Sequence, residues 1–186
     1  ASVIAAHVAN YVALQLGLGH FPAMLIGILA GTSIAFIPGL VNGWMIAYLQ
    51  VPAFIGTLGM YGVARGSAFL LAGGMTIPVS NPWYSYIGNG RVLGIPVLVI
   101  ITAIACLIMH YLLSQTRFGQ HTYAMGASKA AASRAGINIK KLTMKIYLLS
   151  AVTAGIAGSL YSGRFSAGAA QAGEPLLLDS IAAVVI

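Results

Sequence analysis

The stretch "FPAMLIGILAGTSIAFIPGLVNGWMIAYL", Phe21 to Leu49, decides the fold. It carries no charged residue and exceeds the roughly 20 residues that a helix needs to cross the hydrocarbon core of a bilayer. Because lipid gives helices no hydrophobic reason to associate, regularly spaced small residues mark the faces where they pack closely. Such residues recur here at every fourth position: Ala23, Gly27, Gly31, Ala35, Gly39, Gly43 and Ala47. The stretch predicts a long membrane span, tilted or bent at Pro38, that packs inside a helical bundle.

The composition extends this interpretation to the whole chain. Of its 186 residues, 59% are hydrophobic and 6% are charged, whereas a soluble domain has about 25% charged residues. The net charge of +7 would suggest a nucleic-acid partner for a soluble protein, but in a membrane protein it reflects Lys and Arg gathered on one side of the bilayer. We therefore expect an all-α, polytopic transmembrane bundle forming a single domain, with the lipid bilayer and not nucleic acid as its partner.

About five spans are predicted. They cover residues 1–16, 21–49, 53–72, 94–113 and 142–163, the first as the end of a span. The tail 164–186 is either a re-entrant piece or the start of a sixth span. Because the chain begins with Ala1 and stops inside the apolar run "IAAVVI", we expect a fragment of a longer membrane subunit.

Two loops orient the chain. Segment 73–93 is rich in Pro, Gly and Asn and cannot span a membrane, whereas segment 114–141 holds most of the Lys and Arg residues. The positive-inside rule places 114–141 in the cytoplasm and 73–93 outside. Trp83, Tyr84 and Tyr86 then lie where an outer aromatic belt is expected.

The cytoplasmic loop contains "GASKAAASRAGINIKK", residues 126–141. Ser128 suits an N-cap, 129–135 a two-turn helix, and Gly136 the position just after the helix end. A helix this short is not stable alone in water, so it must dock. Its partner is either its own bundle with anionic lipid heads, or a soluble cytoplasmic subunit.

Enzyme motifs are missing. The sequence has no P-loop, HExxH, GxSxG or GxGxxG pattern, and its four histidines lack metal-ligand spacing. We expect no catalytic, cofactor or metal site in this chain. The candidates for a translocation path are instead the polar residues in apolar segments: Asn42, Thr57, Arg65, Glu174 and Asp179. Each also has a structural explanation: a hydrogen bond to a neighbouring helix, an Arg65 side chain that reaches the interface, or an ion pair of the acids with Arg164.

Four stretches carry a resemblance to a known family: "GLVNGWMIAYL" (39–49), "VPAFIGTLGMYGVARG" (51–66), "GQHTYAMGASKAAASRAGI" (119–137) and "AGEPLLLDSIAAVVI" (172–186). They resemble permease subunits of bacterial ABC importers of the ribose/xylose type, within the branched-chain amino acid/monosaccharide permease superfamily. The loop matches the family pattern at Gly119, Ala124, Gly126, Ala130, Ala131, Gly136 and Ile137. It departs from that pattern at Ser128, Lys129 and Ala135, where Asn, an acid and Ser are usual, and Leu177 replaces a usual Glu.

The resemblance implies the permease of an ATP-driven importer for a sugar or sugar-like solute, in the cell inner membrane. Its partners would be a second permease copy, a cytoplasmic ATP-binding cassette subunit that holds the ATP, and an extracytoplasmic solute-binding protein. The loop would carry the helix that couples to the ATPase, through Gly119, Ala124, Gly126, Ser128, Lys129, Ala130, Ala131, Arg134, Gly136 and Ile137. The alternatives are an ion-coupled secondary transporter or channel, and a purely structural membrane subunit.

Overall fold

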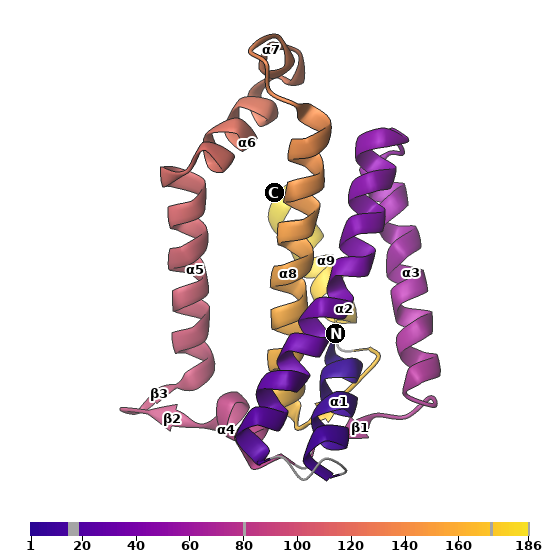
Figure 1. Cartoon of the computed structure of the whole chain (residues 1–186), viewed down its shortest axis with the longest axis vertical. Coiled ribbons are helices and arrows are strands. Elements are labelled where there is room, and N and C mark those ends of the chain that lie inside the picture. The colour runs from indigo at the N-terminus through magenta and orange to yellow at the C-terminus, as the bar shows by residue number, and fades with distance from the viewer. Residues whose placement is uncertain (15–18, 80, 172, 186) are drawn as a thin grey trace.

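The computed structural model describes residues 1–14, 19–79, 81–171 and 173–185 (Figure 1). Positions 15 and 16 of the first predicted span lie outside this part of the chain. The helices are α1 (Ser2–Leu14), α2 (His20–Tyr48), α3 (Ala53–Leu71), α4 (Pro82–Asn89), α5 (Val97–Gln115), α6 (Arg117–Ala127), α7 (Lys129–Arg134), α8 (Ile139–Phe165) and α9 (Glu174–Val185). Two-residue strands form two antiparallel pairs, β1 (Ile77–Pro78) with β4 (Ala167–Gly168) and β2 (Arg91–Val92) with β3 (Ile95–Pro96). The predicted helical class is confirmed.

Within the described residues, four helices are long and apolar enough to cross a membrane: α2, α3, α5 and α8. The two terminal helices are shorter. α1 has 13 residues and α9 has 12, so at 1.5 Å per residue each is about 20 Å long or less, short of the ~30 Å hydrocarbon core. α9 therefore does not make a full crossing within the described tail.

The centre of the bundle is the packing of α2 against α8 (Figure 1). A side chain at Gly31 would come within 2.7 Å of Ser159 Oγ, and one at Gly39 would overlap Ala151. On the α8 side, a side chain at Gly155 would come within 2.9 Å of the Thr32 backbone. The predicted packing face of α2 is confirmed, because every small residue of its stripe except half-buried Ala35 is buried. We call this α2–α8 contact the seam.

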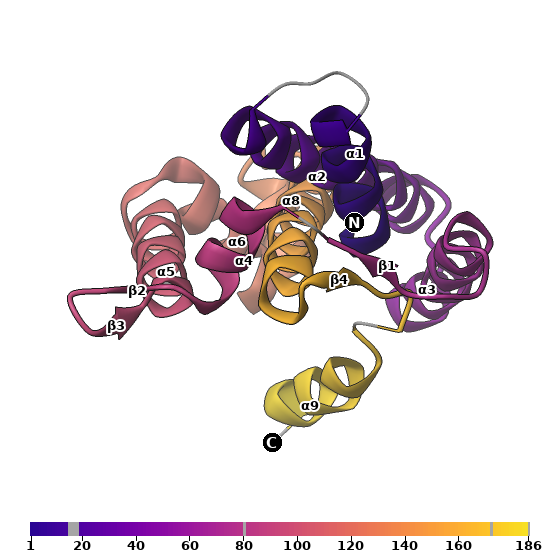
Figure 2. The same ribbon diagram turned by 90° about the horizontal axis from the view of Figure 1, so that it is seen from below.

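The other two long helices lie on opposite flanks of the seam (Figures 1 and 2). α3 packs against α2, whereas the main contacts of α5 are with the short elements α4, α6 and β3. The structure describes all of α5 and buries none of its residues. Hydropathy alone did not distinguish these two helices from those at the centre.

The two predicted loops lie at opposite ends of the bundle, as their assignment to opposite sides requires (Figure 1). The basic segment holds α6 and α7, and the other holds α4 with strands β1 and β2. α6 was not predicted as a separate helix. Its start is visible in retrospect, because Thr116 accepts a hydrogen bond from the Gly119 N–H (3.4 Å) as its N-cap. Which loop faces the cytoplasm stays a prediction.

One aromatic prediction is wrong. Trp83 and Tyr86 are 46% and 48% exposed and contact each other edge to face, as belt residues can, but Tyr84 is only 2% exposed. The reason is helical: α4 lies across the ends of α2 and α8 and turns Tyr84 and Gly88, four residues apart, toward the bundle. Burial raises the pKa of Tyr84 to about 12, so its phenol stays protonated at neutral pH.

Candidate functional site

Two of the predicted path residues meet in one cavity. Asn42 of α2 and Thr57 of α3 line a space of about 240 Å³ between α2, α3 and α8. From α8 the cavity receives Tyr147 and Ser150. Neither was predicted, although the sequence holds a weak indication, since Tyr147 lies one turn before the seam residue Ala151 and Ser150 directly precedes it.

The spacing along α2 and α8 explains the shape of the cavity. The remaining lining residues are small or ring-shaped: Ala35, Pro38, Gly39, Ala151 and Ala154. On α2 they run with Asn42 at positions i, i+3, i+4 and i+7, and on α8 the spacing from Tyr147 to Ala154 is the same. Such positions share one helix face. Two matched faces of small residues thus leave room beside the polar groups, and α2 continues through Pro38 as one helix.

The cavity offers hydrogen bonds without charge. Asn42 Oδ1 is buried and has no hydrogen-bond partner among the described residues, which is costly unless another group supplies a donor. The Thr57 hydroxyl donates to the Ala53 carbonyl (2.8 Å) and keeps its acceptor lone pairs. None of the described residues that line the space is charged. The site therefore suits a neutral solute that carries hydroxyl groups.

The other path candidates lie elsewhere. Arg65 is half-buried on α3, about 12 Å further along the helix than Thr57, and is not among the lining residues. Asp179 is exposed on α9, and the side chain of Glu174 is outside the described residues. The predicted ion pair between Asp179 and Arg164 is not formed in the described part of the chain. Arg164 instead donates to Asn89 Oδ1 (2.9 Å), which ties the end of α8 to α4.

The loop helix forms as its caps predicted. Ser128 Oγ accepts a hydrogen bond from the Ala131 N–H (3.2 Å). At the other end Gly136 has φ of +81°, and the Ile137 N–H donates to the Ala132 carbonyl (3.1 Å) in the bonding pattern of a glycine-ended helix. The observed helix ends at Arg134, one residue earlier than predicted.

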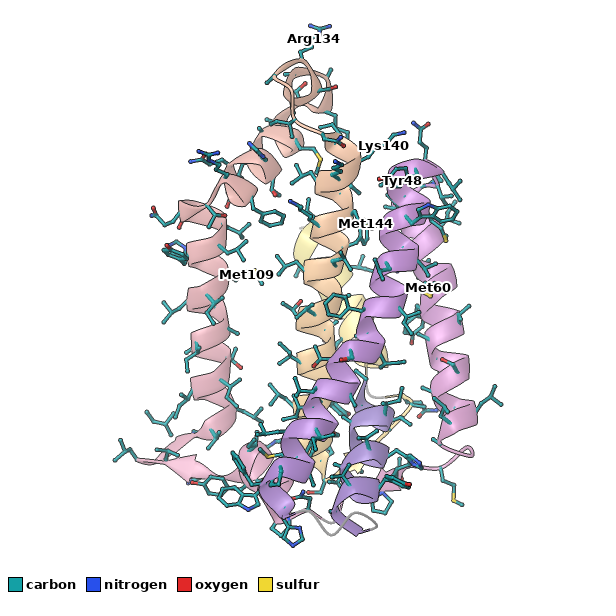
Figure 3. The ribbon with its side chains drawn as sticks, viewed as in Figure 1. Tyr48, Met60, Met109, Arg134, Lys140 and Met144 are labelled. Carbon is teal, nitrogen blue, oxygen red and sulfur yellow. The ribbon has the colours of Figure 1, made fainter. Side chains whose placement is uncertain are left out.

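The loop presents an open surface at the end of the bundle (Figure 3). Ala132 is 3% exposed and faces inward, while the predicted coupling residues Lys129, Ala130, Ala131 and Arg134 are exposed. On α6, Gly119 is buried against the Leu113 backbone, whereas Ala124 is exposed and Gly126 has open space around it. The structure thus brings these residues to one end. Their role in coupling stays a prediction.

The chain is similar to known transport permeases along most of its length. Residues 1–186 match the family described as "Branched-chain amino acid transport system / permease component". The chain is 34% identical over 168 residues to the ribose import permease protein of Escherichia coli (strain K12), covering 87% of this chain and 52% of that protein. It is 36% identical over 166 residues to the galactofuranose transporter permease protein of the same organism, covering 89% and 48%.

A third relative extends the comparison to another organism. The chain is 31% identical over 175 residues to the fructose import permease protein of Rhizobium meliloti, covering 89% of this chain and 48% of that protein. The chain thus spans about half the length of these relatives. No solved structure matches it.

Proposed function

The chain belongs to the branched-chain amino acid transport system / permease component family, and from that premise we propose that it forms part of the permease of an ATP-driven importer for a sugar or sugar-like solute. The relatives named for ribose, galactofuranose and fructose support the solute class. The single observation that carries the proposal is the uncharged cavity between α2, α3 and α8.

The cavity favours a sugar over an amino acid on chemical grounds. A free amino acid is a zwitterion, and a charge within the membrane is expensive unless an opposite charge or a helix end faces it. None of the described lining residues supplies a charge. A sugar hydroxyl, in contrast, can donate to Asn42 Oδ1 and to the Thr57 hydroxyl, which have acceptor capacity to spare.

The partners in this proposal are those of an ABC importer. The complex would lie in the cell inner membrane, where a second permease copy would complete the membrane unit. A cytoplasmic ATP-binding cassette subunit would hold the ATP, and an extracytoplasmic solute-binding protein would deliver the sugar to the permease. Coupling would run through α7, whose exposed Ala130 and Ala131 let another protein approach closely. Movement of that helix would tilt the spans between two states.

Reconstitution tests the transport function. The intact permease, its candidate ATPase and its binding protein are placed in proteoliposomes, and uptake of ribose, fructose and galactose is measured with and without ATP. We expect uptake of one of these sugars only with ATP. Uptake that needs no nucleotide would support the ion-coupled transporter or channel and overturn the importer.

The chain offers a matched pair of threonines for the cavity. Thr57 lines the cavity, whereas Thr102 lies exposed on α5, and each donates to the carbonyl four residues earlier at 2.8 Å. Thr57→Val should lower uptake at low sugar concentration by roughly fivefold, the value of one hydrogen bond of about 1 kcal/mol. Thr102→Val should leave uptake unchanged. Equal uptake by both variants would move the solute path away from this cavity.

A further inference from the structure

A second cavity lies at the end of the bundle that holds α6 and α7. Its volume is about 400 Å³, and it lies between α6, residues 135–138 and the first turns of α8. Three of its lining residues carry a positive charge, Arg117 of α6 and Lys141 and Lys145 of α8, and the basic side chain of His121 of α6 also lines it.

These four residues form two pairs with the same spacing. Arg117 and His121 are four residues apart on α6, as are Lys141 and Lys145 on α8. Lys141 and Lys145 carry like charges, and like charges at this spacing lie on one helix face and destabilise the helix. Because Arg117 of α6 lines the same cavity, a single anion placed between the two helices faces all three charges and relieves the repulsion of the lysine pair.

The protein itself supplies no such anion among the described lining residues. The only two acids of the chain, Glu174 and Asp179, belong to α9 and not to this cavity. All four basic residues are exposed, so a ligand can reach them. An external anion is therefore the group that the cavity fits.

The wall below the charges is apolar. Phe118, Ile137 and Leu142 line it, and Leu142 is only 6% exposed. A basic rim above an apolar wall matches a ligand with an anionic group joined to an apolar body. The adjoining helix α5 has no buried residue and so offers lipid an apolar surface that leads toward α6.

We propose that this cavity binds the phosphate of an anionic phospholipid, with Arg117, Lys141 and Lys145 contacting the phosphate and with Phe118 and Leu142 contacting the acyl chains where they join the glycerol. Basic residues just beyond the cytoplasmic end of a membrane helix attract such headgroups, and the predicted cytoplasmic side of segment 114–141 places this cavity there. A zwitterionic lipid brings its own cation, which Arg117, Lys141 and Lys145 repel. The proposal rests on the membrane-spanning helices, and it does not depend on which solute is carried.

Lipid retention tests the proposal directly. The intact permease is placed in nanodiscs of phosphatidylglycerol mixed equally with phosphatidylcholine, and native mass spectrometry measures which lipid stays bound after release. We expect phosphatidylglycerol to be retained preferentially. Lys141→Gln with Lys145→Gln should lower that preference roughly 30-fold, because each lysine near the surface contributes about a factor of five to anionic lipid binding.

Two control variants separate this site from general charge. Lys129→Gln with Arg134→Gln removes the same charge from exposed positions of α7 that do not line the cavity, and it should leave the preference intact. Lys141→Arg with Lys145→Arg keeps the charge and should retain the lipid. If the α7 pair lowers the preference as much as the α8 pair, or if phosphatidylcholine is retained equally, the proposal is overturned.

A comparison with inorganic phosphate tests whether the cavity binds a lipid headgroup or any free phosphate anion. Thermal unfolding of the detergent-solubilised permease is followed as millimolar phosphate or soluble short-chain phosphatidylglycerol is added. The lipid should raise the melting temperature at a concentration at least tenfold lower than phosphate does. Stabilisation by phosphate at the same concentration would show a simple anion site and overturn the headgroup assignment.

Discussion

The seam helices α2 and α8 and the flanking helix α5 are all long and apolar enough to cross a membrane, yet α2 and α8 bury part of their residues and α5 buries none. α5 is the most apolar of the long helices, and none of its residues is buried. α2 and α8 contain more glycine, alanine and serine, and several of these residues are buried, among them Gly31, Gly39, Gly155 and Ser159 where the two helices meet. In a bilayer an apolar side chain gains nothing by leaving lipid, so it is the small residues that mark a packed face. Hydropathy identifies the membrane spans, whereas small residues identify the faces on which two helices pack together.

The largest effect is expected where α4 closes the end of the seam. Tyr84 is 2% exposed, and a Cβ added at Gly27 would lie 3.3 Å from its hydroxyl, while one at Gly163 would lie 2.9 Å from its backbone carbonyl. Tyr84→Ala removes a buried ring and should lower the free energy of unfolding by about 4 kcal/mol. Reversible unfolding in mixed micelles measures this change.

Two controls sharpen that test. Tyr86→Ala, on the same helix but half-exposed, should cost at most about 1 kcal/mol. Tyr84→Phe keeps the buried ring and removes only the hydroxyl, so it should cost at most about 1.5 kcal/mol, far less than Tyr84→Ala. Equal losses at Tyr84 and Tyr86 would show that α4 does not close the seam.

A slightly smaller effect is expected inside the seam. Gly39→Leu places a side chain where Ala151 lies and should destabilise the bundle by about 3 kcal/mol through overpacking. Gly62→Leu on α3 is the matched control, because nothing lies within 4 Å of a side chain there. It should be neutral or stabilising, since leucine favours helix over glycine. The same unfolding measurement compares the two variants. Equal destabilisation would show that the seam is no more closely packed than α3.

The smallest effect is expected on α5. Ala105→Leu adds the same kind of bulk to an exposed position and should change the free energy of unfolding by less than about 0.5 kcal/mol. If it destabilises the permease as strongly as Gly39→Leu, α5 packs against protein in the assembled complex and the contrast with the seam disappears.

Much of the fold follows from short-range patterns. The unbroken apolar stretch of α2 predicted a span, and its fourfold spacing of small residues predicted the packed face. Ser128 and Gly136 predicted the ends of α7 to within one residue, because caps act through bonds between near neighbours. Tyr84 was assigned wrongly because its place depends on α4 crossing two helices distant in sequence.

For the candidate site too, the sequence identified individual residues, whereas the packing decided which of them meet. Asn42 and Thr57 stood out as polar residues in apolar spans, but their meeting with Tyr147 and Ser150 required the packing of three helices. Arg65 stood out equally, and the structure leaves it outside the cavity. The basic residues of segment 114–141 predicted a side of the membrane, and only the fold gathers Arg117, Lys141 and Lys145 around one space.

The sequence by itself thus determined the membrane class, the approximate spans, the packed face of α2 and the caps of the loop helix. These depend on composition and on spacing within a few turns, where bonding and packing rules are local. Only the tertiary structure decided which spans meet, which aromatic ring is buried and which charges converge. Those outcomes depend on how closely glycine-bearing helices approach one another, and no local pattern specifies that distance.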